Sequence, residues 1–271
     1  MSHFLIVDND SDDGTTAFLA QQRDVSLWVT KASYKASRFG MDWATWLLMH
    51  YGKDKWCLTV DADELLVYPE IETRNLRDLC LFLDQNQILA MGAFMLDLYP
   101  QGPINSVSYE AGQDPREVLT HFDPGPYHAQ RQKPRGNLWL QGGVRERVFF
   151  ADNPVQGPTL NKLPLVKWNW RYAYINSTHS LLPPKLNALY DGPTDPRLTG
   201  VLLHTKFLPC AIEKSVEEKT RKQHFRNPNV FQEYYDSIVE GPNLFGDVSV
   251  KYEGPAQLES LGLMSRGAWV P

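Results

Sequence analysis

The first hundred residues alternate apolar β-rich runs with helical or turn-forming segments, and this alternation limits the possible folds most strongly. Apolar runs mark the expected strands, at 4–7, 25–30, 56–60 and 88–98. Amphipathic spacing marks the expected helices, at 15–22, 39–47 and 76–83. Repeated βα units imply right-handed crossovers and a twisted sheet covered by helices. The sequence therefore predicts an α/β fold of the Rossmann type, with three α/β/α layers and a mostly parallel central sheet.

Size and composition are those of a folded protein with reduced thiols. The chain has 271 residues, 42% of them hydrophobic, and three widely separated cysteines without CxxC spacing. The residues after Met1 lack a basic leader and a long apolar run, and no apolar stretch approaches the roughly 20 residues of a membrane span. We therefore expect a cytoplasmic protein. Its formal net charge of −5 argues against a nucleic-acid partner.

Two aspartates, Asp61 and Asp63, directly follow the apolar run 56–60. Side chains two positions apart in an extended chain point the same way, so both carboxylates are expected beyond the carboxyl end of a strand, where parallel α/β sheets place ligands. Unpaired carboxylates at this spacing repel each other, and a hard divalent cation removes the repulsion. The turn therefore predicts a site for Mn²⁺ or Mg²⁺; the alternative is a solvated acidic turn.

The first apolar run also ends in an acidic turn, with four aspartates between positions 8 and 13. One interpretation is that Asp8, at the strand end, accepts a hydrogen bond from the base or sugar of a ligand. The other is an Asx-rich βα turn that caps the helix after it. The sequence leaves both interpretations open.

Together the two turns resemble those of glycosyltransferases of the GT-A type. IVDNDSDDGT, from Ile6, is similar to the VVDDGSTDGT turn of the family 2 enzymes, and WCLTVDADELLVYP, from Trp56, is similar to their strand and DxD motif. The closest likeness is to the bacterial branch with a DADE sequence (Glyco_tranf_2_4-type). Weaker likenesses lie further along the chain, in GGVRERVF, NKLPLVKW, STHSL and LLHTKFL.

The resemblance implies a GT-A-like fold and a role for each matching residue. Asp8 matches the residue that contacts the nucleotide base, usually uracil. Asp61 matches the first DxD carboxylate, which approaches the ribose and the metal, and Asp63 matches the second, which coordinates the metal. His204 resembles the C-terminal histidine that many such enzymes add to the metal site. Lys206, two positions later, is expected on the same side and near a phosphate.

The acceptor side is less defined. An inverting transfer needs a general base within hydrogen-bond reach of the acceptor hydroxyl, and the candidates are Asp97, Glu146 and His179. Arg145 and Arg147 alternate with Glu146, so on a strand both would face one side, where forked guanidinium donors suit a phosphate or an acidic acceptor. The alternative for the two arginines is ion pairing on a solvated strand.

The charge is divided unevenly along the chain. Residues 1–98 hold 8 Lys and Arg against 15 Asp and Glu, whereas residues 131–226 hold 16 against 7. The basic part suits a diphosphate, an anionic acceptor or peripheral contact with the inner face of a membrane. We expect one domain over 1–226, with a nucleotide- and metal-binding half (1–98) and an acceptor half (99–226). A C-terminal extension, 227–271, is expected to pack on it.

The family normally has an earlier strand and helix before the segment that corresponds to Phe4, and we expect this chain to lack that first strand. Its absence would expose a sheet edge and weaken nucleotide binding. Translation from an internal codon is one hypothesis for it.

The function that the resemblance implies is a metal-dependent transfer of a sugar, with inversion, from a nucleotide-diphosphate sugar, UDP-sugar first, to a hydroxyl of a glycan, lipid-linked or other acceptor. An enzyme relic that binds a sugar nucleotide or glycan without turnover is the alternative. A phosphatase of the haloacid-dehalogenase type also carries Asp-x-Asp after a strand, but its signature needs Thr or Val where Leu65 stands.

Overall fold

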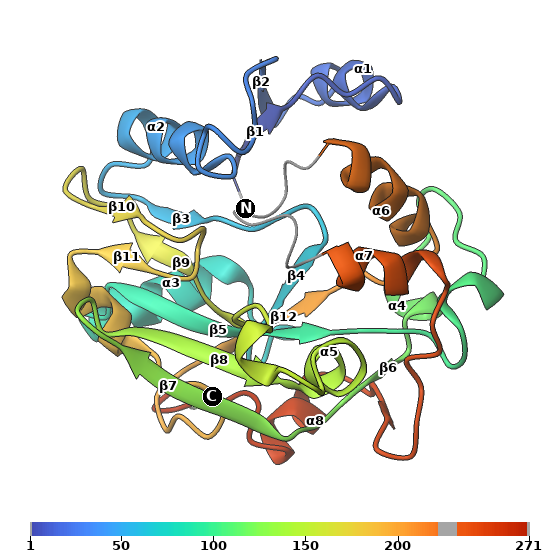
Figure 1. The fold of residues 1–271 in the computed structure, drawn as a ribbon. Helices are drawn as coiled ribbons and strands as arrows, with labels where there is room; N and C mark the ends of the chain where they lie inside the picture. Colours follow the sequence, from blue (N-terminus) through green and yellow to red (C-terminus); the bar gives the residue numbers. More distant parts are fainter. Residues whose placement is uncertain (1, 222–231, 270–271) are drawn as a thin grey trace.

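A five-stranded sheet with the order β3-β9-β5-β12-β4 forms the centre of the molecule (Figure 1). The computed structural model describes residues 2–221 and 232–269. The strands of this sheet, from one edge to the other, are β3 (Trp56–Leu58), β9 (Asn161–Lys167), β5 (Ala90–Asp97), β12 (Gly200–His204) and β4 (Glu64–Val67). Every residue of β5 and β12 is buried, which explains their continuous apolar sequence.

The expected mostly parallel sheet is wrong, because the sheet is mixed. Only β5 and β12 pair in parallel, while β9 runs antiparallel between β3 and β5, and β4 runs antiparallel beside β12. A parallel crossover takes a dozen or more residues. Only residues 59–63 separate β3 from β4. They lead from one outer strand of the sheet to the other, and β4 then runs in the direction opposite to β3. As a result β3, β5 and β12 run in one direction, and β9 and β4 run in the other. The carboxyl ends of the first three and the starts of the other two lie along the same side of the sheet, which we call its site edge, or the edge for short.

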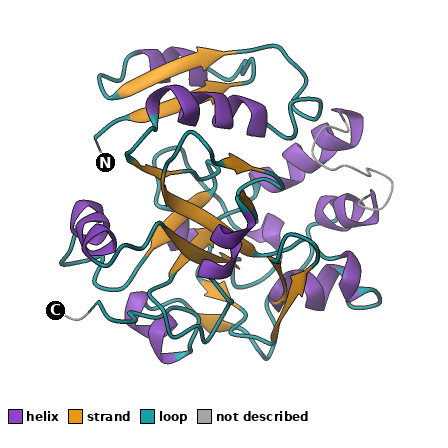
Figure 2. Cartoon of the chain, turned by 90° about the vertical axis from the view of Figure 1, so that its left-hand side faces the viewer, coloured by secondary structure: helices purple, strands orange, loops and turns teal. Residues whose placement is uncertain are grey.

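The N-terminal βαβ unit forms a layer of its own rather than part of the central sheet. It comprises β1 (Phe4–Asp8), α1 (Thr15–Ala20) and β2 (Val25–Val29), close to the expected bounds, with β1 and β2 paired in parallel as a separate sheet. Figure 1 and Figure 2 show this unit and α2 (Met41–Tyr51) above the central sheet. Asp8 is the only buried residue of the two strands, so their apolar side chains supply little core.

The remaining helices flank the sheet or lie beyond its ends. They are α3 (Leu76–Gln85), α4 (Pro115–Val118), α5 (Gly143–Phe149), α6 (Cys210–Arg221), α7 (Gln232–Val239) and α8 (Pro255–Ser260), with 3₁₀ turns η1 (Ile104–Ser106), η2 (Pro154–Gln156) and η3 (Pro184–Leu189). A capping box of Asn75 and Asp78 begins α3, and its apolar stripe buries Leu79 and Leu83 completely.

Short strands pair in the middle and at the end of the chain. They are β6 (His121–Phe122), β7 (Tyr127–Gln132), β8 (Asn137–Gly142), β10 (Ala173–Tyr174), β11 (Leu181–Leu182) and β13 (Val250–Lys251). The pairs are β7 with β8, β10 with β11, and β6 with β13, all antiparallel. The pairing of β7 with β8 is a six-residue hairpin ladder.

The segment around Arg145 and Arg147, expected as a strand, is the helix α5. Two glycines let β8 turn into this helix: Gly142 has a φ of 133° and Gly143 a φ of 63°. A Cβ on Gly143 would lie 2.8 Å from the Tyr127 hydroxyl, so the helix starts directly against that ring. The helical turn places Arg145 and Arg147 at different angles around an axis, so the two guanidinium groups do not share a face.

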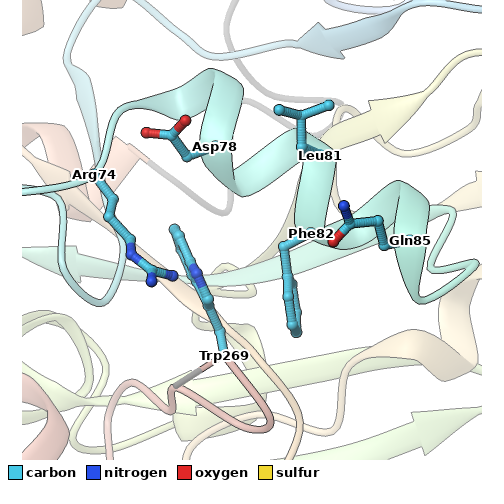
Figure 3. A pocket seen from close by; sticks show the side chains of 6 residues that line it. All are labelled: Arg74, Asp78, Leu81, Phe82, Gln85 and Trp269. Carbon is cyan, nitrogen blue, oxygen red and sulfur yellow. The ribbon is translucent and has the colours of Figure 1, made fainter. Parts of the chain in front are cut away.

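Residues of the C-terminal part pack on the same core as the sheet. Leu258, Leu263 and Met264 are buried in the main hydrophobic cluster. Trp269 stacks on Phe82 of α3 with ring centroids 5.9 Å apart, and the Arg74 guanidinium lies 5.3 Å from its ring centroid. Figure 3 shows the pocket beside this stack, lined by Arg74, Asp78, Leu81, Phe82, Gln85 and Trp269.

No helix within the described residues is long and apolar enough to cross a membrane. The end of the basic part, with Lys222, His224 and Arg226, lies outside the described residues, as does the expected boundary at 226.

Gly92 provides a test of how closely β5 is packed. A Cβ at this position would overlap Cβ and Cγ of Tyr190, which is 1% exposed. Gly92→Ala should therefore lower the free energy of unfolding by about 2 kcal/mol in a urea titration, because neither the strand centre nor the ring has room to move. Gly246→Ala, where the nearest atom is 3.4 Å away, is the control. Equal stability of the two variants would contradict the packing described here.

Candidate functional site

One edge of the central sheet gathers most of the ionisable residues that the sequence singles out. Asp61 and Asp63 lie in the crossing between β3 and β4, Asp97 ends β5 and His204 ends β12. His204 is in register with Asp97 on one side and with Glu64 on the other. Three strand ends and two strand starts thus bring side chains far apart in sequence to one place.

Asp63 and His204 face each other at the surface of this edge. Asp63 Oδ2 lies 3.2 Å from His204 Nε2, and the Asp63 side chain is 42% exposed. Burial disfavours both charges, but the attraction to His204 and Lys206 holds the pKa of Asp63 well below its usual range. Likewise burial opposes the imidazolium, but Asp63 and Asp97 outweigh it and raise the pKa of His204. The pair is therefore an ion pair that opens toward solvent on the Asp63 side.

Asp97 lies behind His204, in a fully enclosed position. Its Oδ1 accepts hydrogen bonds from His204 Nδ1 at 2.6 Å and from Arg145 Nη2 at 2.7 Å. Burial raises the pKa of Asp97, but Arg145 and His204 outweigh this and lower it to about 2. A carboxylate bound to Nδ1 fixes the ring so that Nε2 points outward, the arrangement that orients metal-binding histidines. In this structure Asp97 and Arg145 therefore position His204.

Asp61 is held by a residue that the sequence analysis missed. Lys162 Nζ, at the start of β9, lies 3.0 Å from Asp61 Oδ2 and 2.8 Å from Glu64 Oε1. Glu64 Oε2 also accepts a hydrogen bond from the Asp61 amide at 3.0 Å. Burial raises the pKa of Asp61, but Lys162 outweighs it, and the pKa of this carboxyl is lowered. The sequence did hold one signal for this role, because Lys162 is a charged residue at the start of the apolar run NKLPLVKW.

His179 lies close to the Asp61 and Lys162 pair. Its Nδ1 is 2.5 Å from the Asn161 carbonyl oxygen, and the Asn161 amide donates to the His179 carbonyl at 2.9 Å. Burial and the charge of Lys162 lower the pKa of His179 to about 3. The ring is therefore neutral at pH 7, with Nδ1–H donating to the carbonyl and Nε2 left as an acceptor.

The Asp8 carboxylate is hydrogen-bonded to residues of its own turn and of the helix after it. Its carboxylate accepts hydrogen bonds from the hydroxyls of Ser11 and Thr16 and from the Ser11 amide at 3.3 Å. These bonds, Ser11 first, lower the pKa of Asp8. The observed contacts lie within the turn and reach Thr16 of α1, but the N-cap residue of that helix, Gly14, makes no side-chain capping bond, so the expected cap is not formed.

Of the other expected site residues, Arg147 and Glu146 pair elsewhere, whereas Lys206 stays close enough to lower the pKa of Asp63. Arg147 pairs with Asp123, Nε to Oδ2 at 2.8 Å, and donates to the Leu244 carbonyl at 2.6 Å. Glu146 Oε1 lies 4.0 Å from His128 Nε2. Lys206 Nζ lies 5.3 Å from the centroid of the Tyr234 ring. Lys206 thus remains beside the edge, whereas Arg147 joins α5 to the C-terminal part.

The donor atoms present limit what kind of metal site this edge can form. No group of three or more His, Cys, Asp or Glu side chains in the described ranges is arranged to hold an ion. Asp63 offers an exposed carboxylate oxygen, and His204 offers Nε2 only when its ring has lost the proton of the ion pair. Mg²⁺-like ions commonly use one or two protein carboxylates together with substrate phosphates and water. An ion at this edge would therefore take its other ligands from water or from a bound phosphate group.

Comparison of the chain with protein-family models, with curated proteins and with solved structures gave no match. The likeness to glycosyltransferases therefore consists of the motifs quoted above, and the function has to be argued from the geometry of the site.

Asp97 gives the site a pH signature. Its folded pKa of about 2 is below the ordinary value of about 3.9. The ionised group therefore contributes stability that is present above pH 4 and lost as the pH falls through 2. Asp97→Asn should lower the free energy of unfolding at both pH values, and this loss, measured by urea titration, should be about 1 kcal/mol smaller at pH 3 than at pH 6.

Asp84→Asn is the control, because Asp84 pairs with Lys167 at the surface, 2.6 Å away. It should cost less than about 1 kcal/mol at both pH values. A cost of Asp97→Asn that does not change with pH would contradict the ion pairing of this carboxylate.

Proposed function

We propose that this protein is a metal-dependent glycosyltransferase that moves a sugar from a nucleotide-diphosphate sugar, UDP-sugar first, to an acceptor hydroxyl. The observation that supports it most is the meeting of the Asp61–Asp63 turn with His204 at one sheet edge, although 141 positions separate Asp63 from His204. The resemblance of the first turn, at residues 8–15, adds support. That turn lies inside a βαβ unit, which precedes the Asp61–Asp63 turn in the chain. A GT-A-like layered arrangement is part of the same proposal.

In this proposal Asp63 and His204 hold a divalent ion, Mn²⁺ or Mg²⁺. Such an ion, when bound, stabilises the negative charge of the diphosphate as it leaves the sugar. Asp97 and Arg145 keep His204 Nε2 directed at the ion, since both contact the ring at Nδ1. Lys206, two residues after His204, is available to the diphosphate from the same edge, and Asp61 approaches the nucleotide.

The acceptor side of the proposal is narrower than the sequence suggested. Asp97 is 6% exposed and already binds two cationic groups, so its role here is to orient His204. Glu146 and His179 stay as candidates for the general base; burial and Lys162 lower the pKa of His179 to about 3, so its neutral ring is only weakly basic. A glycan or lipid-linked hydroxyl is the proposed acceptor class.

A second candidate function is binding of a sugar nucleotide without turnover. It is favoured by one specific observation: the three aspartates that the resemblance assigns to ligand binding already have internal partners, Lys162 for Asp61, His204 for Asp63, and Ser11 for Asp8. Groups satisfied in this way bind a ligand without having to act as a base or nucleophile.

The test is release of UDP from UDP-sugars with and without Mn²⁺. Asp63→Asn should lower the Mn²⁺-dependent rate by about a hundredfold or more, because it removes one of two protein ligands of the ion. Asp42→Asn, which removes an exposed carboxylate of α2 that binds Arg38 Nε at 2.7 Å, should keep the wild-type rate. Turnover that needs no metal would contradict the proposal, and tight UDP-sugar binding without turnover would support the second candidate.

A further inference from the structure

Lys162 is a buried cation whose position the proposed chemistry does not explain. Its side chain is only 3% exposed, although lysine is almost never fully buried unless it is paired. It contacts two carboxylates of different character: Glu64, which is fully buried, and Asp61, whose side chain is 52% exposed at the rim of the site. Lys162 therefore joins the interior of the sheet to the acidic turn.

Charge balance explains why both carboxylates are needed where they are. A buried ammonium group costs several kcal/mol in desolvation unless a carboxylate is close to it. Glu64, 2.8 Å away and fully buried, supplies one of the two opposing charges. Asp61 Oδ2, 3.0 Å away, supplies the other, so the contact that compensates the lysine also holds the acidic turn. Burial lowers the pKa of Lys162, but Asp61 and Glu64 outweigh it, so the ammonium stays charged.

The same three residues fix the backbone of the turn. Glu64 Oε2 accepts the Asp61 amide hydrogen at 3.0 Å, while Lys162 holds the Asp61 carboxylate. The backbone amide and the carboxylate of Asp61 are thus both tied to one buried ion pair. The carboxylate pair that metal binding was expected to stabilise is stabilised by the chain itself.

We infer that Lys162 is a positioning residue that keeps Asp61 off the divalent ion and leaves Asp63 and His204 as its protein ligands. It follows that the protein alone binds the ion weakly, and that the ion enters together with the diphosphate. This last step rests on the proposed function; the effect of Lys162 on metal affinity does not.

The test measures binding of Mn²⁺ alone, by titration with detection of free Mn²⁺ by electron paramagnetic resonance. Lys162→Met frees the Asp61 carboxylate, so its Kd for Mn²⁺ should be about tenfold lower than that of the wild type, since ligand charge sets affinity at such sites. Lys162→Arg should keep the wild-type Kd. Lys167→Met, on the same strand but paired with Asp84 at the surface, is the matched control. A folded Lys162→Met protein that binds Mn²⁺ no more tightly than the wild type overturns the inference.

Two further variants decide the matter if Lys162→Met does not fold. Asp61→Asn removes the held carboxylate without emptying the interior, and it should lose much less Mn²⁺ affinity than Asp63→Asn. Equal losses would show that Asp61 is a ligand and would overturn the inference. These measurements need no sugar donor, so they test the role of Lys162 even if the protein transfers no sugar. In the same way, a negative result for Lys162 does not decide whether the protein is a glycosyltransferase.

Discussion

The central constraint on this structure is charge compensation at one edge of the main sheet. Four carboxylates meet three cationic groups there, namely Asp61, Asp63, Glu64 and Asp97 with Arg145, Lys162 and His204. Groups this buried are costly unless each finds a partner of opposite charge. The strands that carry these groups therefore have to end close together, so that each charge meets its partner. Of the seven groups, Asp61 and Asp63 are the ones that reach the surface.

The direction of the strands makes this meeting possible. With β3, β5 and β12 pointing one way, three chain segments deliver polar ends to the same edge, and the reversed β9 and β4 begin there with Lys162 and Glu64. A fully parallel sheet would send both starts to the opposite edge. The mixed sheet thus supplies the internal cation that the acidic turn uses, and the departure from the expected topology is part of how the site is built.

The sequence predicts local features well and pairings poorly. The strands β1, β2, β3 and β5 and the first helices follow from periodicity, and so does the position of Asp61 and Asp63 after a strand end. Lys162 escapes notice because its role depends on which strand lies beside β5, a contact between residues about 70 apart in sequence that no local pattern encodes. The helix α5 escapes because alternating charges in RER suit a strand, whereas Gly142 and Gly143 allow the turn against Tyr127 that starts a helix.

The claim on which this account depends most is that Asp63 and His204 together hold a divalent ion shared with a diphosphate. A crystal structure of the protein with Mn²⁺ and UDP, with data collected at the manganese absorption edge, tests it directly. The account predicts one anomalous peak at bonding distance from Asp63 and His204 Nε2 and from diphosphate oxygens, with Lys162 still bound to Asp61. A peak elsewhere, or UDP bound at this edge with no manganese beside it, would contradict it.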